Sequence, residues 1–417
     1  MTKRPYEIAC SKLSEIASDA DIPLSHRAIA LKEHCPLDAA YAALFSSGDA
    51  STLIVGASEC SYYTRMGTPN NFEEGVLHWT YTLEEADIVF GCEKGLTEAI
   101  VKMHGRGIRR LAVLATCVPN VIADDIEAVV RKMREDLDMS ILYVSLPHFM
   151  TKSPSAGLVE YYKATTTLME PAAHKHDVIN VLGTVSGDEF SVVSNLLEQA
   201  GFKVNRLGAD TRLMDFVNAP EAKLNLLYSM SMLQMAEAMR ERFDIDFIDF
   251  TRASRCEDLD TPYQKLARLT GAPLSKALQP FREKLQANMN AFKHLEREKT
   301  YIFLEKEDDT LAHVVMLSTL GFIPKLLHVE VYRDRDGATR KVLLDSGIDP
   351  DVCYDVGGDP EHLVDLYDVD MVIGGDASET LKRPQVRYPQ ERFVGYEKQT
   401  KRLEAIRETL EGETDGT

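Results

Sequence analysis

Short apolar runs alternate with amphipathic stretches along most of this chain, which predicts strands and helices in turn. From about residue 35 the apolar runs STLIVGA, RRLAVLAT and SILYVSLPH are separated by the helical stretches LTEAIVKMHGRG and DDIEAVVRKMREDL. Strand, helix and strand at this spacing predict a parallel sheet with helices on both faces, because parallel strands need a long crossover connection.

The same pattern restarts twice further along the chain. A second unit begins at HDVINVLGTVSGDEFSVVSNLLEQAGFKVNRLG and continues through the buried strand LNLLYS and the helix MAEAMRERF. A third begins at KTYIFLEKEDDTLAHVVMLSTLGFIPKLLHVEVY, and VDMVIGGDASETL is expected to be its closing strand. We therefore predict an α/β protein with three doubly wound units, whose ligand clefts lie at the carboxyl ends of the strands.

These patterns also give predicted domain boundaries. A chain of 417 residues exceeds the roughly 250 to 300 residues at which one hydrophobic core stops growing, so several domains are expected. We predict a helical lead-in over 1–30, a first α/β domain over 31–170, a second over 171–255, a helical connector over 256–299, a third α/β domain over 300–395, and a C-terminal helix with an acidic tail over 396–417.

The charge balance bears on possible partners. Against 66 acidic residues the chain carries 47 lysines and arginines, a net charge of −19, which disfavours a nucleic-acid partner and offers no polybasic membrane patch. No apolar run reaches the roughly 18 residues that a membrane span requires, and the start MTKRPYEIACSKL lacks the apolar core of a secretory signal. We expect a cytoplasmic protein with neither nucleic-acid nor membrane partners.

Three of the seven cysteines carry the candidate chemistry. Cys35, Cys60 and Cys117 lie in HCPLDAAYAAL, GASECSYYTRM and LATCVPNVIADDI, each where a predicted strand or buried turn meets a helix. Thiolates suit iron–sulfur clusters or zinc, but the wide spacing is unlike that of a zinc knuckle. A cluster normally takes about four ligands, so the fourth is expected from a partner subunit, a non-cysteine side chain or solvent. The helix start after Cys35 is expected to favour its thiolate.

The remaining polar and sulfur-containing patterns have alternative interpretations. GTVSGDEF lacks the ending of a phosphate-binding loop, so no nucleotide site is expected. His148 follows a predicted strand and is either a proton donor near a cleft or a structural histidine. Cys92, in VFGCEKGL, is ambiguous, and the other three cysteines, Cys10, Cys256 and Cys353, are expected to be small buried side chains.

Several of these segments together resemble one family. CPLDAAYAAL, GASECSYY, ADIVFGCEKGLTEAI, ATCVPNVIADDI, LLEQAGFKV and APEAKLNLLYS are similar to segments of nitrogenase component 1-like proteins. That family includes molybdenum–iron protein subunits, their cofactor-assembly scaffold, dark-operative tetrapyrrole reductases and methylthio-alkane reductases. The resemblance covers most of the chain from Cys35 to about residue 250, with a weaker match in the third unit.

The resemblance implies a fold, a cofactor and partners. It implies three Rossmann-like domains and a homologous sister subunit, in a heterodimer or heterotetramer. Cys35, Cys60 and Cys117 match the family's ligands of an interfacial iron–sulfur cluster, either [8Fe-7S] of the P-cluster type or [4Fe-4S]. It further implies that electrons arrive from an ATP-hydrolysing [4Fe-4S] reductase protein. Phe90 resembles the phenylalanine on which that reductase docks.

One departure from the family pattern narrows the expected role. In KLNLLYSMSML, Ser229 stands where the catalytic nitrogenase subunit has a cysteine that binds the iron–molybdenum cofactor, and no histidine matches that cofactor's second ligand. The resemblance therefore implies an ATP-dependent oxidoreductase subunit that relays electrons, with the complex cofactor in its sister subunit and methylthio-alkane or nitrogenase-type reduction as the reaction. The alternatives are a tetrapyrrole reductase subunit with one [4Fe-4S] cluster and a cofactor-assembly scaffold. Ser229 and His148 are the candidate residues for a substrate cleft.

Overall fold

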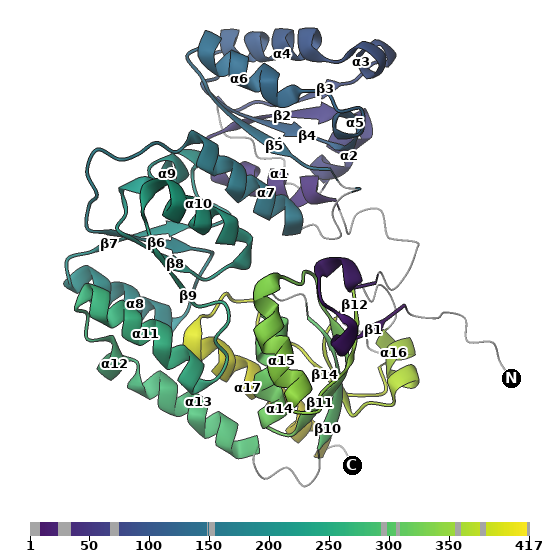
Figure 1. The fold of residues 1–417 in the computed structure, drawn as a ribbon, viewed down its shortest axis with the longest axis vertical. Coiled ribbons are helices and arrows are strands. Elements are labelled where there is room, and N and C mark those ends of the chain that lie inside the picture. Colours follow the sequence, from purple (N-terminus) through teal and green to yellow (C-terminus); the bar gives the residue numbers. More distant parts are fainter. Residues whose placement is uncertain are drawn as a thin grey trace, which may run out of the picture. The chain divides into compact units, whose positions relative to one another are not determined.

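A computed structural model describes residues 9–23, 35–66, 75–147, 149, 155–292, 298–305, 309–354, 360–375 and 381–414 (Figure 1). It contains three sheets that are built mainly from parallel strand pairs, and the predicted α/β fold class is confirmed. The chain divides into two compact units, one formed by Ala30–Thr184 and Phe202–Phe247 and the other by Met1–Ile29, Val185–Gly201 and Ile248–Thr417.

The first sheet has the strand order β3-β2-β4-β5, in which all neighbours are parallel. Its central strands β2 and β4 are nearly continuous apolar runs and are buried on both faces, as expected for a parallel sheet covered by helices. The strands are β2 (Ser51–Gly56), β3 (His78–Thr82), β4 (Arg110–Ala115) and β5 (Ser140–Ser145).

Helices cover both faces of the first sheet (Figure 1). On one face lie α4 (Glu93–Gly105) and α6 (Ile126–Asp136); α6 buries Ile126, Val129, Val130 and Met133, the spacing of an amphipathic helix. On the other lie α1 (Pro36–Ser47) and α7 (Ser155–Thr165), whose apolar side chains enter a separate core. The sheet therefore divides this region into two cores.

The core on the α1 and α7 side is shared with the second sheet. That sheet has the order β7-β6-β8-β9, with β6 parallel to both β7 and β8. The buried side chains of Asn180 and Asn225 link its two central strands, because Asn180 Nδ2 donates a hydrogen bond to Asn225 Oδ1 at 2.9 Å. Its elements are β6 (Val178–Leu182), β7 (Lys203–Leu207), α9 (Leu213–Val217), β8 (Leu224–Leu227), α10 (Leu233–Phe243) and β9 (Phe247–Asp249).

The third sheet has the order β1-β12-β11-β10-β13-β14. Its neighbours are parallel apart from β1, which pairs antiparallel with β12. The strands are β1 (Ser11–Lys12), β10 (Lys299–Leu304), β11 (Phe322–His328), β12 (Asp351–Cys353), β13 (Met371–Gly374) and β14 (Gln385–Val386).

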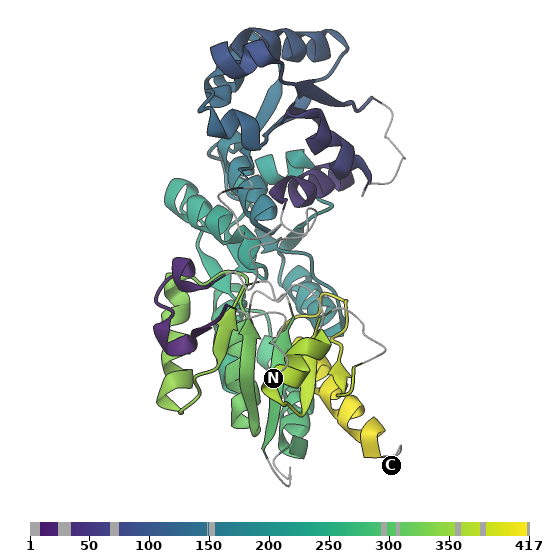
Figure 2. The same ribbon diagram turned by 90° about the vertical axis from the view of Figure 1, so that its right-hand side faces the viewer.

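The described part of the lead-in, residues 9–23, differs from the helix expected there. It forms β1 and two 3₁₀ turns, η1 (Leu13–Glu15) and η2 (Asp19–Asp21). Figure 2 shows this purple segment beside α15 (Gly337–Asp345), where Arg340 donates to the Leu13 carbonyl at 2.8 Å. Partners from residues more than 300 positions away determine this structure, and the local sequence pattern does not report them.

Further helices lie between the second and third sheets, over the residues of the expected connector. The connector consists of α11 (Cys256–Thr270), α12 (Leu274–Ala277) and α13 (Gln279–Ala291). The remaining helices are α8 (Asp188–Gln199), α14 (Thr310–Thr319), α16 (Pro360–Tyr367) and α17 (Gly395–Thr414).

Candidate metal-cluster site

Two of the three candidate cysteines follow neighbouring strands at the carboxyl edge of the first sheet. Cys60 lies in the first turn of α2 (Ser58–Met66), soon after β2, and Cys117 begins α5 (Cys117–Val121), just after β4. β2 and β4 are parallel and paired, with Val55 opposite Ala115. The two thiols therefore leave the sheet from adjacent strands at the edge where ligands bind in this architecture.

A close contact holds these two strand ends together. Thr116, the residue before Cys117, donates from Oγ1 to the Val55 carbonyl at 2.9 Å. A Cβ atom on Gly56 would lie only 1.9 Å from the same hydroxyl oxygen. Glycine at this position is therefore required for the ends of β2 and β4 to approach as closely as they do.

Cys35 reaches the same region from a different segment. It is the residue before α1, whose first position is Pro36, and its side chain packs against the core cluster that Cys60 also contacts. Helix α7 lies directly on this turn, because a Cβ on Gly157 would come within 1.8 Å of the Pro36 carbonyl oxygen. The position of Cys35 thus depends on a helix about 120 residues further along the chain.

The electrostatic environment of Cys35 and Cys60 disfavours bare thiolates. Burial is the main cause that raises the pKa of the Cys35 thiol to about 11, and negative charge on Asp38, Cys117 and Cys60 contributes in the same direction. Burial likewise raises the pKa of Cys60, although the polar side chain of Thr116 opposes part of that rise. The helix start was expected to favour the Cys35 thiolate, but desolvation is the larger effect.

The donor set fits a polynuclear cluster better than a single ion. Within the described residues, no three His, Cys, Asp or Glu side chains converge closely enough to hold one metal ion. The three cysteines are instead half-buried soft donors, near enough for each charge to act on another. Because burial raises the pKa values of Cys35 and Cys60, cationic iron would stabilise their thiolate forms, so an iron–sulfur cluster fits this site.

Phe90 lies at the surface of the α/β region that also carries the three candidate cysteines. It ends the short helix α3 (Glu85–Phe90) and is 86% exposed, beside the exposed Ile88 and Val89. Solvent-exposed aliphatic and aromatic side chains grouped in this way are typical of a protein contact surface.

The turn after Phe90 is connected to the segment that carries Cys117. The Cys92 backbone N–H donates to Asp124 Oδ2 at 2.7 Å, and Asp124 follows α5 in the chain. The Cys92 side chain is buried in the core on the α4 and α6 side, whereas Cys35 and Cys60 pack on the opposite face of the sheet. The sheet thus separates the Cys92 thiol from that core.

Of the two other candidate residues, Ser229 and His148, the structure describes Ser229. Ser229 is half-buried just after β8, where its hydroxyl lies 2.8 Å from that of Ser231 and its backbone N–H donates to the Leu182 carbonyl at 3.1 Å. It sits at the carboxyl edge of the second sheet, an edge separate from the one that carries Cys60 and Cys117. His148 lies outside the described residues.

Three residues that support this site were not identified from the sequence. Thr116 joins the ends of β2 and β4, Gly157 fits against the Cys35 turn, and Asp124 holds the turn after Phe90. Thr116 could have been noticed because it stands next to Cys117. The importance of Gly157 and Asp124 depends on contacts between segments that no local pattern reports.

The comparisons with known proteins agree on one family. The family described as Nitrogenase component 1 type Oxidoreductase matches residues 35–406. The cofactor biosynthesis protein NifE of Nostoc sp. is 29% identical over 60% of this chain and 58% of its own length. The nitrogenase molybdenum–iron protein alpha chain of Leptolyngbya boryana is 27% identical over 47% of this chain and 45% of its own length. The chain spans about half the length of the curated relatives it matches.

Solved structures agree on the fold. "Nitrogenase Cp1 at pH 6.5" superposes with a TM-score of 0.73, covering 94% of this chain and 95% of that one at 18% identity. In the described part of the chain, every helix is too short or too polar to cross a membrane. Since the family match extends over most of the sequence, the chain belongs to the nitrogenase component 1 type oxidoreductase family.

Proposed function

We propose that this chain is the electron-relaying subunit of a nitrogenase-like reductase, and that Cys35, Cys60 and Cys117 bind its iron–sulfur cluster. The observation that carries the proposal is that these three half-buried thiols lie in one region of the first α/β domain, close enough for their charges to interact. Two leave adjacent parallel strands, and the third packs against the same core as Cys60. Membership in the nitrogenase component 1 family supports the same function.

The residues of this chain would hold the cluster and control its surroundings. When bound, an iron–sulfur cluster supplies a one-electron carrier whose potential depends on burial and hydrogen bonding. Each cysteine releases its proton on ligation, because the thiolate is the ligand. The apolar core beneath Cys35 and Cys60 limits water access from that side. The polar side chain of Thr116 acts on the Cys60 thiol and favours its ionised form.

The remaining ligands and the active site belong, in this proposal, to a homologous sister subunit. Three thiolates are fewer than a [4Fe-4S] or [8Fe-7S] cluster takes, which supports completion of the site from another chain. Ser229 in place of a cofactor-binding cysteine supports an active-site cofactor outside this chain. The proposed reaction is reduction of a methylthio-alkane or of dinitrogen.

The cluster assignment is tested by three single substitutions. Cys35→Ala, Cys60→Ala and Cys117→Ala, each purified anaerobically with its partners, should lose iron and acid-labile sulfide together with turnover. Cys92→Ala is the matched control, because this cysteine is buried in the same region but on the other face of the sheet. Iron content, sulfide content and the EPR spectrum are the measurements. Wild-type values in all three variants would refute the assignment.

Electron delivery would occur over the exposed group formed by Ile88, Val89 and Phe90. Phe90→Ala should reduce turnover driven by the ATP-hydrolysing reductase by about tenfold, the effect of losing roughly 1.4 kcal/mol of contact energy. Iron content and the EPR spectrum of the chemically reduced cluster should not change. Leu269→Ala, an exposed position on α11, is the control. Unchanged turnover in the Phe90 variant would contradict this docking site.

The relatives favour a second candidate function. Several similar proteins, including the NifE proteins of Nostoc sp. and Clostridium pasteurianum, are named for iron–molybdenum cofactor biosynthesis. A scaffold would use the same cysteines but would release a precursor cluster to an acceptor. Transfer of iron to a metal-free acceptor protein, without reduction of any substrate, would support the scaffold and contradict the reductase.

A further inference from the structure

A polar hollow of about 500 Å³ opens at the amino edge of the first sheet. The starts of the two central strands border it, with Ser51 on β2 and Arg110 on β4. Cys60 and Cys117 follow the carboxyl ends of the same strands. The hollow and the candidate cluster site therefore lie at opposite edges of one sheet, and the proposed electron relay does not use the hollow.

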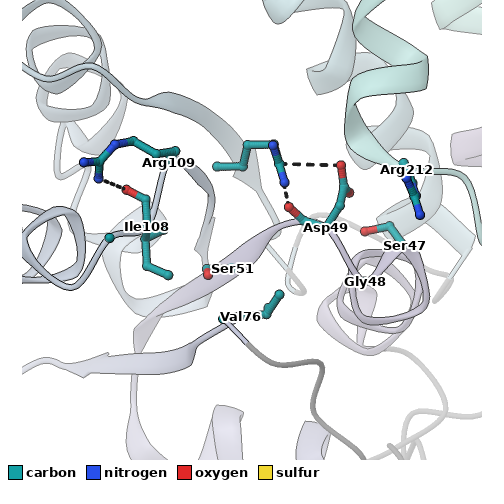
Figure 3. Close-up of a pocket in the computed structure, with 11 residues that line it drawn as sticks. Ser47, Gly48, Asp49, Ser51, Val76, Ile108, Arg109 and Arg212 are labelled. Atoms are coloured by element: carbon teal, nitrogen blue, oxygen red, sulfur yellow. Dashed lines mark hydrogen bonds and ion pairs between the residues drawn. The ribbon is translucent and has the colours of Figure 1, made fainter.

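Three arginines surround this hollow (Figure 3). Arg109 donates through Nη1 to the carbonyls of His104 and Ile108, at 3.1 and 3.0 Å. Arg110 donates through Nε to the Asp49 carbonyl at 2.7 Å. Within the described residues, the Arg212 side chain forms neither a hydrogen bond nor an ion pair, and the terminal nitrogens of Arg110 form no hydrogen bond. Several guanidinium donors are therefore available to a ligand.

Among the described residues, Asp49 is the one acidic side chain that lines the hollow. Its Oδ1 accepts the Leu213 backbone N–H at 2.8 Å, and its Oδ2 lies 3.6 Å from Arg110 Nε. The Asp49 carboxylate thus binds the first backbone N–H of α9 and interacts with Arg110. Among the described residues that line the hollow, the guanidinium groups of Arg109 and Arg212 therefore have no carboxylate partner. In Figure 3, Arg109 and Arg212 appear on either side of Asp49.

The cationic lining continues into a second hollow of about 450 Å³. Arg109 and Arg110 line both hollows, and Arg134 and Asp138 are added in the second. Arg134 is anchored by its hydrogen bond to the Ile141 carbonyl at 2.6 Å. This local excess of arginine contrasts with the net charge of −19 of the whole chain and favours binding of an anion here.

We propose that the hollow lined by Arg109, Arg110 and Arg212 binds a small oxyanion that carries at least two negative charges. Planar guanidinium groups match phosphate and carboxylate oxygens in paired hydrogen bonds, so this lining suits either type of group. Ser51 adds a hydroxyl group to it, whose oxygen accepts the Leu77 N–H at 3.0 Å. The volume accommodates a small metabolite but is too small for a folded partner.

Isothermal titration calorimetry with inorganic phosphate, and separately with citrate, tests the site at fixed ionic strength. We expect saturable binding of at least one of the two anions. Arg212→Gln should weaken it about tenfold or more, the effect of removing one charge-assisted hydrogen bond. Arg109→Gln is a second variant in case the first does not fold. Arg131→Gln, an exposed arginine on α6 that lines neither hollow, is the matched control.

The two anions distinguish the type of ligand. Tighter binding of phosphate assigns a phosphate-bearing ligand, and tighter binding of citrate assigns a polycarboxylate. Binding of neither anion, or binding weakened equally by the Arg131 and Arg212 variants, overturns the proposal. The iron content of Arg212→Gln should stay at the wild-type value, because the arginine lies at the edge opposite the cysteines; this separates the outcome from that of the cluster assignment.

Discussion

Among single residues, Gly157 shows that the candidate cluster site depends on a position where only a glycine fits. Gly157 belongs to α7 and touches the backbone of the turn that carries Cys35. Its hydrogen atom occupies the space that any other side chain would need. The position of one thiol is therefore set by the size of a residue that has no chemical role.

We expect Gly157→Ala to displace the Cys35 turn. The new Cβ would lie 1.8 Å from the Pro36 carbonyl oxygen, so α7 or the turn must move, at a cost of about 1–3 kcal/mol in the free energy of unfolding. Iron content should fall as well, because a displaced thiol no longer fits the cluster. Denaturant unfolding and iron analysis are the measurements.

The control for this substitution is Gly105→Ala. Gly105 is also helical, at the end of α4, but among the described residues no neighbouring segment would come within 4 Å of a Cβ added there. This variant should keep its iron and be up to about 1 kcal/mol more stable, since alanine favours the helix. Equal behaviour of the two variants would show that the contact with Pro36 is unimportant.

At the scale of elements, α8 and α17 are joined at their amino-terminal ends by a reciprocal pair of glutamates. Fully buried Glu189 accepts the backbone N–H groups of Tyr396 and Glu397, at 3.2 and 2.6 Å, and the Tyr263 hydroxyl at 2.5 Å. In return, the Glu397 carboxylate accepts the Glu189 N–H at 2.9 Å. Each glutamate thus caps the helix to which the other belongs.

This pair should make stability depend on pH. Burial raises the pKa of Glu189 to about 8, and the hydrogen bonds from Tyr263 and the two amides only partly oppose the rise. In the unfolded chain the pKa is about 4.3. Between these values the folded protein keeps a proton that the unfolded chain has released, so the contribution to stability, complete below about pH 4.3, is lost as the pH rises towards 8.

Glu189→Gln tests this dependence, because glutamine resembles the protonated acid and does not ionise. The unfolding free energy of the variant, relative to the wild type, should rise by at least about 1.4 kcal/mol from pH 5 to pH 8, the equivalent of one pKa unit. Asp188→Asn, at an exposed neighbouring position, is the control. A difference that stays constant with pH would show that Glu189 is ionised in the folded protein.

At the scale of the whole molecule, the candidate cysteines are confined to one of the two compact units. Cys35, Cys60 and Cys117 all belong to the unit formed by Ala30–Thr184 and Phe202–Phe247. The third sheet, with strands such as β10 and β11, belongs to the other unit. Ligation energy is released where the ligands are held, so cluster binding should stabilise the two units unequally.

Removal of iron by a chelator should therefore loosen the molecule locally. We expect amide hydrogen exchange to increase about tenfold or more in α1, α2 and α5. Loss of the cluster should lower the free energy of local unfolding there by well over about 1.4 kcal/mol. Strands β10 and β11 should keep their protection. Equal increases in both units, measured by mass spectrometry before and after chelation, would contradict a cluster confined to these cysteines.

The periodic patterns predicted most elements because they report local burial. STLIVGA and RRLAVLAT became β2 and β4, and DDIEAVVRKMREDL became α6. The lead-in was predicted less well, since its β1 strand exists only through pairing with β12. Of the site, the cysteine positions at the helix starts could be predicted, whereas the contacts of Gly157 and Asp124 could not.

The α/β class, the parallel sheets and the helix that follows Cys35 could be predicted from the sequence, because strand and helix periods are properties of consecutive residues. Which of these residues meet depends on the folded structure. Strand order brings β2 beside β4, and helix packing brings Gly157 to Pro36. The same packing gathers Asp49, Arg110 and Arg212 around one hollow. Such contacts join distant segments, so no local pattern contains them.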